Sequence, residues 1–112
     1  MSCGCQDATT APSAKAFADA YQAKFNTPPS TYSPEAYDAT NLLIEAIKVA
    51  KAAGKIDRKS VNDAVGKADF TGITGQIKFG PDGDLPAGVG TVNLFQQKAG
   101  AIVSLGDVSK AS

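Results

Sequence analysis

Residues 33–53 constrain the fold more than any other part of this 112-residue chain, because they have the pattern of one long apolar helix. Ser33 suits the N-cap, Pro34 suits the first turn, and Gly54 suits the left-handed position after the last turn. The wide apolar arc of this helix is formed by Tyr37, Leu42, Leu43, Ile44, Ile47 and Ala50. A helix with so broad an arc is largely buried, so it needs a packing partner of comparable extent.

Two shorter helices flank the long one. Pro12 suits the first helical position, and the apolar residues after it recur at helical spacing until the stop at 27–30. They are Ala14, Phe17, Ala18, Tyr21 and Phe25. A third helix is expected after Asp57, which can cap it, with a buried stripe made by Val61, Ala64, Val65 and Ala68. The segment 6–11 is small and polar and predicts a lead-in loop.

From Phe70 onward the periodicity changes from helical to alternating. Residues 71–75 are rich in turn formers, and 81–84 predict a reverse turn with Gly83 at positive φ. Short strands are expected at 76–79, 91–95 and 101–105, the last two joined as a β-hairpin. The polar tail from Asp107 is expected to fray.

The expected strands offer too little surface to cover the long apolar helix. A long apolar helix normally packs on a sheet, yet the expected strands are few, late and short. The chain therefore predicts a fragment of a larger fold, whose sheet is encoded elsewhere.

The charge balance excludes several classes of function. Lys+Arg and Asp+Glu both number 11 and histidine is absent, so the chain lacks the basic face of a nucleic-acid binder and the polybasic cluster of a membrane anchor. Without histidine, neither a Ser-His-Asp triad nor a histidine-activated cysteine is possible. The sequence therefore predicts a protein that is not an enzyme.

No cofactor or metal site is expected either. Cys3 and Cys5 provide two of the four ligands that structural zinc requires; they can form a local disulfide, pair between chains or stay reduced. Asp82-Gly83-Asp84 offers too few oxygen ligands for calcium and suits a turn. The segment that contains Gly72, Gly75 and Gly80 is not followed by the Gly-Lys-Ser/Thr sequence of a phosphate loop.

Membrane insertion and export signals are not predicted. The apolar run 41–53 is interrupted by Glu45, Lys48 and Lys51, so it cannot span a bilayer. Residues 1–5 contain neither the basic nor the apolar region of a signal peptide.

Several motifs together resemble the branched-chain amino acid (Leu/Ile/Val) receptors among the periplasmic-type solute-binding proteins. The first is Phe17-x-x-x-Tyr21-x-x-x-Phe25, followed by a proline-containing loop to Tyr32 and by Glu35-Ala36-Tyr37-Asp38-Ala39. The second is Phe70-x-Gly72-x-x-Gly75-x-Ile77-x-Phe79 with Asp82-Gly83-Asp84. Each piece is weakly specific, but their order and spacing over 11–107 are similar to the closing region of that family.

The resemblance implies an α/β chain, namely a C-terminal fragment of a type I periplasmic-binding-protein fold with three helices and then three short, mainly antiparallel strands. It implies a single partial unit over 1–112, in which 12–84 belong to the first lobe and the hairpin 91–105 belongs to the second. A hinge crossing is expected at 84–90.

The resemblance also implies a non-catalytic receptor segment. The parent would bind branched-chain or related amino acids for an ABC transporter, dock on its membrane permease and be periplasmic or extracellular, as a cell-surface lipoprotein. Tyr32 matches the aromatic residue that touches the ligand side chain in that family. The alternative role for Tyr32 is purely structural, as a loop aromatic packed on the helix start. The other ligand-holding groups have no counterpart here, so an isolated copy is expected to bind amino acids weakly or not at all.

Two other interpretations stay open. In one, the chain is a free-standing structural or interaction domain whose three strands pair together and cover the long helix. In the other, it is the ligand-binding domain of a sensory regulator, which uses the same fold. The fragment interpretation predicts an exposed apolar face around Leu42, Leu43 and Ile47, and hence self-association or rearrangement.

Overall fold

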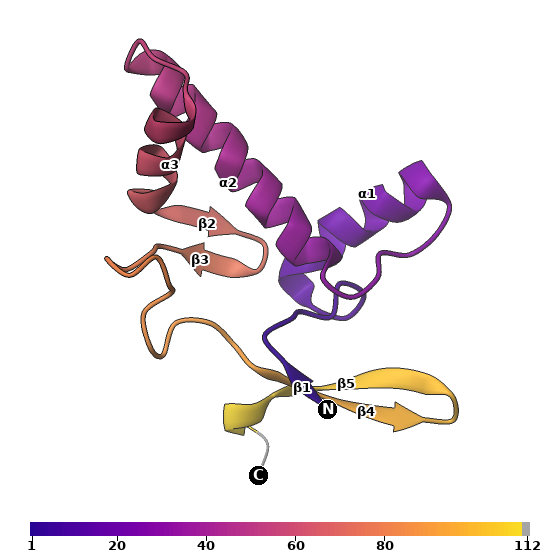
Figure 1. The fold of residues 1–112 in the computed structure, drawn as a ribbon. Coiled ribbons are helices and arrows are strands. Elements are labelled where there is room, and N and C mark those ends of the chain that lie inside the picture. The colour runs from indigo at the N-terminus through magenta and orange to yellow at the C-terminus, as the bar shows by residue number, and fades with distance from the viewer. Residues whose placement is uncertain (111–112) are drawn as a thin grey trace. The chain divides into compact units, whose positions relative to one another are not determined.

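The computed structural model describes residues 1–110 and contains three α-helices, two short 3-10 helices and five strands within that range (Figure 1). In chain order the elements are β1 (Ser2–Cys3), η1 (Pro12–Ala14), α1 (Lys15–Phe25), α2 (Ser33–Ala52), α3 (Arg58–Gly66), β2 (Phe70–Gly72), β3 (Gly75–Ile77), β4 (Asn93–Lys98), β5 (Ala101–Asp107) and η2 (Val108–Lys110). The three helices and the antiparallel strands agree with the expected fold class.

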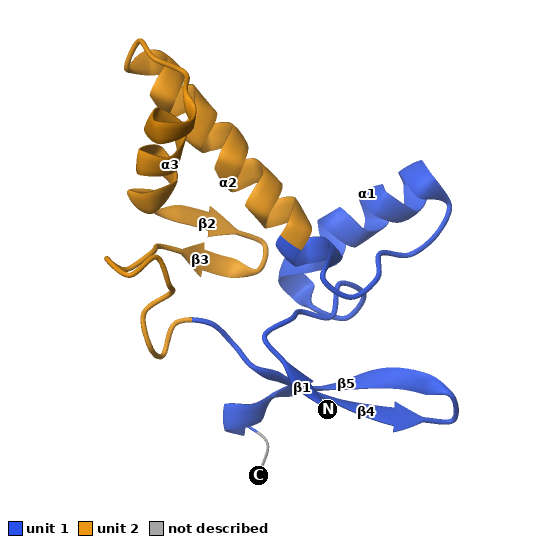
Figure 2. Ribbon diagram, in the orientation of Figure 1, with its two compact units in different colours: residues 1–35, 90–112 blue, residues 36–89 orange. Residues whose placement is uncertain are grey.

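The chain divides into two compact units (Figure 2). The first unit combines Met1–Glu35 with Gly90–Ser112, and the second is Ala36–Val89. The boundary falls within the first turn of α2, so the start of this helix belongs to the first unit and the remainder to the second.

The first unit contains a three-stranded antiparallel sheet in the order β1-β4-β5. The β4–β5 hairpin closes through Ala99 and Gly100, whose φ angles of 47° and 84° match the turn that best follows strand twist. The short strand β1 joins the other edge of β4, with Cys3 opposite Asn93. Residues more than 90 positions apart in sequence therefore share one sheet.

The same unit holds η1 and α1. Ala14, the last residue of η1, is fully buried, and α1 ends at Phe25, followed by Asn26 in the left-handed conformation with φ 54°. Asparagine is the residue other than glycine that most readily adopts this conformation, so the predicted end of the first helix is confirmed.

The second unit contains most of α2 together with α3 and the β2–β3 hairpin. Asp57 caps α3 as expected, because its side chain accepts a hydrogen bond from the Ser60 amide at 2.8 Å while the Ser60 hydroxyl accepts one from the Asp57 amide at 3.0 Å. This reciprocal pair satisfies amides that the first helical turn leaves unpaired.

One face of α2 is buried. Its buried residues in the second unit recur every four positions and are Asp38, Leu42, Ala46 and Ala50. Asp38 reaches the turn of the β2–β3 hairpin, so this column faces the hairpin side of the unit. An exposed apolar face was predicted around Leu42, Leu43 and Ile47. For Leu42 this prediction is wrong, because the residue is buried.

A second face of α2 is apolar but exposed. Leu43, Ile44 and Ile47 are 49%, 44% and 43% exposed, and Tyr37 is also exposed on this side of the helix. The apolar arc of α2 is therefore wider than its buried column, and the uncovered part is surface that a further layer could cover. Within residues 1–110 the strands form two separate sheets, so the single sheet imagined for a free-standing domain is not observed.

Several local expectations were wrong. β1 lies where no strand was expected, and β2 lies in a segment that had been interpreted as a turn. Ser33 is the first residue of α2, and its hydroxyl accepts from the Ser30 amide upstream, so it does not act as the N-cap. The tail does not fray at Asp107, because β5 reaches this residue and the Val108 amide donates to the Val92 carbonyl at 2.9 Å.

Among the described residues, no helix is both long enough and apolar enough to cross a membrane.

Candidate functional site

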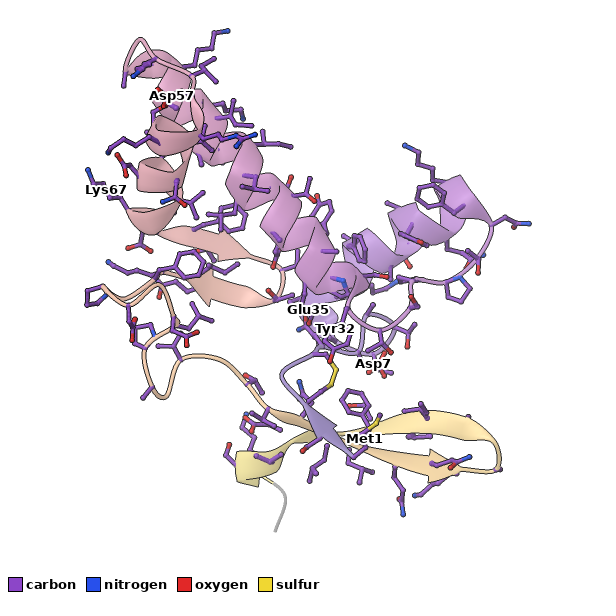
Figure 3. All side chains as sticks on the ribbon, viewed as in Figure 1. Met1, Asp7, Tyr32, Glu35, Asp57 and Lys67 are labelled. Atoms are coloured by element: carbon purple, nitrogen blue, oxygen red, sulfur yellow. A yellow bond between two sulfur atoms is a disulfide. The ribbon has the colours of Figure 1, made fainter. Side chains whose placement is uncertain are left out.

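Tyr32, the predicted ligand contact, stands at the end of the loop that joins α1 to α2 (Figure 3). Its backbone has φ 65°, a left-handed conformation that bulky residues seldom adopt, and its side chain is 57% exposed. Strained backbone of this kind is concentrated at functional positions and persists where the surrounding structure holds it. Tyr32 therefore combines a constrained backbone with a largely exposed residue surface.

The loop before Tyr32 supplies this constraint. The Ser30 amide donates to the Ser33 hydroxyl at 3.1 Å, and the Ser33 amide donates to the Ser30 carbonyl at the same distance. Pro29 and Pro34 on either side are buried. These contacts close a tight turn around Tyr32.

A pocket of about 260 Å³ lies beside this turn, entirely within the first unit. Its lining comes from three segments of the chain: the N-terminal segment 1–9, the loop 29–31 and the hairpin residues Phe95 and Ile102. Its walls combine apolar side chains with the polar groups of Gln6, Asp7, Thr9, Ser30 and Thr31. Such a mixture suits a small molecule with an apolar body and hydrogen-bonding groups.

Asp7 gives the pocket a negative charge. Its burial opposes ionisation, but hydrogen bonds from Thr9 and Thr10 outweigh that effect and hold the pKa of the Asp7 carboxyl below its ordinary value. The Thr9 amide and hydroxyl lie 2.9 and 2.7 Å from one carboxylate oxygen. The carboxylate therefore stays charged at neutral pH, within an otherwise uncharged group of side chains from segments 6–9 and 29–31.

Glu35 lies near this segment and ties it to the first turn of α2 (Figure 3). The Gln6 amide donates to one Glu35 carboxylate oxygen at 2.6 Å, and the Gln6 side chain donates to the Ser13 hydroxyl at 2.8 Å. Within the described residues, the remaining side-chain oxygens of Gln6 and Glu35 are buried and accept no hydrogen bond. Each of these two oxygens can still accept a hydrogen bond from a further donor.

In the second unit, the two motif segments noted in the sequence meet at Asp38. The Ile73 and Thr74 amides lie 3.0 and 2.8 Å from the two oxygens of the Asp38 carboxylate, and the Thr74 hydroxyl also donates to it. Asp38 is only 1% exposed, so its charge is compensated almost entirely by these donors. The Tyr37-Asp38-Ala39 motif and the glycine-rich motif are thus two halves of one structural contact.

Cys3 and Cys5 are joined to each other by a disulfide, which settles the alternatives left open by the sequence. Cys5 is 2% exposed and lines the pocket, and its carbonyl accepts a hydrogen bond from the Asn93 side chain at 3.0 Å. The disulfide appears as the yellow bond in Figure 3.

The other segments weighed as sites have structural roles. Gly83 has φ 83°, and the Asp82 carboxylate accepts from the Asp84 amide at 3.2 Å, which is the geometry of a turn. Within residues 1–110, no three His, Cys, Asp or Glu side chains are grouped as a metal would require.

The sequence predicts a ligand contact at Tyr32, which is not among the residues that line the pocket, and it does not predict the pocket itself. Asp7 and Thr9 lie in a segment predicted to be a plain loop, and their Asp-x-Thr spacing was the one available signal for a side-chain-capped turn. Phe95 and Ile102 belong to the hairpin, more than sixty residues after the loop 29–31, and no local pattern indicates that these segments meet.

Comparisons with known proteins agree with the resemblance found in the sequence. The family model described as periplasmic binding protein matches residues 5–101. A solved structure of the leucine-binding protein LivK from Thermotoga maritima superposes with a TM-score of 0.69 and 25% sequence identity, covering 92% of this chain and 28% of that protein. No curated protein matches the chain. This chain spans less than a third of the leucine-binding protein, and it belongs to the periplasmic binding protein family.

Proposed function

We propose that this chain supplies the C-terminal portion of a non-catalytic, extracellular solute-binding protein of an ABC transporter, with a branched-chain or related amino acid as its ligand. The observation that carries the proposal is Tyr32, an exposed aromatic residue on a left-handed backbone. By the resemblance found in the sequence, this residue would take the place of the one that touches the ligand in the amino acid receptors.

The chemistry of Tyr32 fits an aliphatic ligand side chain. A tyrosine ring offers a large apolar surface with few rotatable bonds, so contact with a leucine-like side chain requires little loss of conformational entropy. A turn that is already hydrogen-bonded between Ser30 and Ser33 lowers that entropic cost further. The solved leucine-binding protein supports the amino acid class of the proposed ligand.

The second apolar face of α2 supports membership of a larger receptor. In a two-lobed α/β receptor this helix would lie between its own unit and the parallel sheet of the first lobe, which would cover Leu43, Ile44 and Ile47. Under the proposal, residues 12–84 serve the first lobe, the hairpin 91–105 serves the second, and the connection at 84–90 is a hinge.

The remaining requirements of binding fall to other parts of the receptor. A zwitterion that leaves water needs partners for both its carboxylate and its ammonium group, and Tyr32 supplies neither. An isolated copy of the chain should therefore bind leucine weakly or not at all, and its permease partner should recognise only the closed, complete receptor.

A chimera tests the proposal: the matching segment of the Thermotoga leucine-binding protein is replaced by this chain. Tyr32→Ala in the chimera should weaken leucine binding by about tenfold or more, since a buried aromatic contact contributes about 1–3 kcal/mol. Phe25→Ala is the matched control, because Phe25 is a similarly exposed aromatic residue at 55% but lies at the far end of α1.

Isothermal titration calorimetry reads the affinities, and thermal melting shows that each variant is folded. Tyr32→Phe should retain binding, because the proposed contact uses the ring. If the folded Tyr32→Ala chimera binds leucine as well as the Phe25→Ala chimera does, Tyr32 is not a ligand contact.

A further inference from the structure

The disulfide between Cys3 and Cys5 closes a loop that contains one intervening residue. In the chain-entropy model, a disulfide stabilises a protein by restricting the unfolded chain, and the gain grows with the length of the closed loop. This bond therefore restricts the unfolded chain far less than one that joins distant segments would.

Other contacts already hold the N-terminal segment in place. Cys3 pairs with Asn93 in the sheet, the Asn93 side chain donates to the Cys5 carbonyl at 3.0 Å, and the Gln6 amide donates to Glu35 at 2.6 Å. None of these contacts involves sulfur. The Cys3–Cys5 bond can consequently open while the backbone on both sides of it keeps its partners.

The two sulfur-bearing residues differ in access to solvent. Cys5 is 2% exposed, whereas Cys3 is half-buried and Gly4 between them is exposed. A Cβ atom placed on Gly4 would meet no atom within 4 Å apart from its chain neighbours Cys3 and Cys5, so no other segment covers this position. Thiol–disulfide exchange requires a thiolate to reach one sulfur from outside, and Cys3 is the more accessible of the two residues.

We propose that the Cys3–Cys5 disulfide is a thiol–disulfide exchange site that reacts with a dithiol reductant at Cys3. A thiolate of the dithiol attacks the Cys3 Sγ, the Cys3–Cys5 bond breaks, and the Cys5 sulfur leaves and takes up a proton. The second thiolate of the dithiol then attacks its own sulfur in the mixed disulfide and releases Cys3. Two electrons pass to the protein, and the dithiol becomes a disulfide.

The consequence is a change in one wall of the pocket. Cys5 lines the pocket beside Asp7 and Thr9, so opening the bond converts a fixed disulfide at that wall into a thiol that can rotate. The first unit would thus have an oxidised form and a reduced form with the same backbone contacts.

The test uses the full chain under native conditions. The protein is treated with a small molar excess of dithiothreitol, quenched with acid, labelled with a maleimide and weighed by mass spectrometry, while circular dichroism follows the helices. We expect two labels per chain with an unchanged helical signal, and loss of both labels after oxidation by glutathione disulfide. The Cys3→Ser/Cys5→Ser double variant should take no label and should keep the helical signal.

Single variants locate the reactive sulfur. Cys3 in Cys5→Ser should react with iodoacetamide at least about tenfold faster than Cys5 in Cys3→Ser, because thiol reactivity follows exposure. The proposal is overturned if the native chain takes no label until urea unfolds it, if reduction abolishes the helical signal, or if both thiols stay free in glutathione disulfide. Equal rates in the two single variants would overturn the assignment to Cys3. None of these readouts depends on amino acid binding.

Discussion

Gly72 lies directly against the buried carboxylate of Asp38, so closely that a Cβ atom on Gly72 would overlap the Asp38 side chain. The carboxylate holds the turn between β2 and β3 through the Ile73 and Thr74 amides. This contact joins Asp38 of α2 to a hairpin that begins at Phe70, more than thirty residues after Asp38. The glycine of the motif is therefore required by close approach to Asp38 and not by its own backbone angle.

Gly72→Ala should destabilise the chain by about 2–4 kcal/mol, because the added methyl group must displace either the carboxylate or the hairpin from its hydrogen-bonded position. Urea unfolding followed by circular dichroism measures the change. Gly66→Ala is the matched control: a Cβ atom there meets nothing within 4 Å, and alanine at this last residue of α3 should leave stability unchanged or raise it by about 0.5–1 kcal/mol. Equal effects of the two substitutions would contradict the close contact.

Asp38→Asn should lower the free energy of unfolding by about 1.5–3 kcal/mol, because an amide retains one acceptor oxygen where the two carboxylate oxygens accept three hydrogen bonds. A double-mutant cycle with Thr74→Val isolates the side-chain part of the contact. The two substitutions should not be additive, because the bond that Thr74→Val removes is made to the Asp38 side chain that the first substitution alters. Strict additivity would show that this bond contributes nothing to stability.

The cap of α3 predicts a dependence of stability on pH. A hydrogen bond from Lys55, together with bonds from Ser60, lowers the pKa of the exposed Asp57 carboxyl from 3.8 to about 2. Because the pKa is lower in the folded state, the contribution of the ionised Asp57 to stability is fully present above pH 3.8 and is lost as the pH falls toward 2. Asp57→Asn keeps a good N-cap but cannot ionise, so its thermal midpoint should fall less than that of the parent over this range. If the thermal midpoints of both proteins fall equally with pH, Asp57 is not the source of the pH dependence.

The two faces of α2 should respond differently to truncation. Leu42→Ala should cost about 2–4 kcal/mol, because Leu42 is 5% exposed, whereas Leu43→Ala should cost less than about 1 kcal/mol, because Leu43 is 49% exposed. Replacing Leu43 and Ile47 together by serine should reduce binding of an apolar dye by the isolated chain without unfolding it. Light scattering should show less self-association in the same variant. An isolated chain that is monomeric and binds no dye would contradict an uncovered second face.

The long helix could be predicted from the sequence because its boundaries and apolar arc are local signals. Its last helical residue, Ala52, lies two positions before Gly54, the residue expected to follow its end. The strand at Phe70–Gly72 could not be predicted, since its turn is fixed by Asp38, a residue 35 positions away from Ile73. The strand at Ser2–Cys3 depends in the same way on β4, near the other end of the chain.

The candidate site was predictable to a smaller extent. Tyr32 is predicted as a ligand contact from its neighbours in a motif, whereas its left-handed backbone and its exposure are properties of the folded turn. Gln6 and Cys5, which line the pocket, are held by contacts with distant segments, through Glu35 and Asn93 respectively. Pairings of this kind are set by tertiary packing, which local patterns of residues do not encode.

Titrating leucine into the chimera that carries this chain in the Thermotoga leucine-binding protein tests the proposed role in an amino acid receptor. The account predicts a folded chimera whose Kd for leucine lies within about tenfold of the parent's, a change of about 1.4 kcal/mol. A chimera that melts cooperatively but shows no heat of binding with leucine, isoleucine or valine would contradict it.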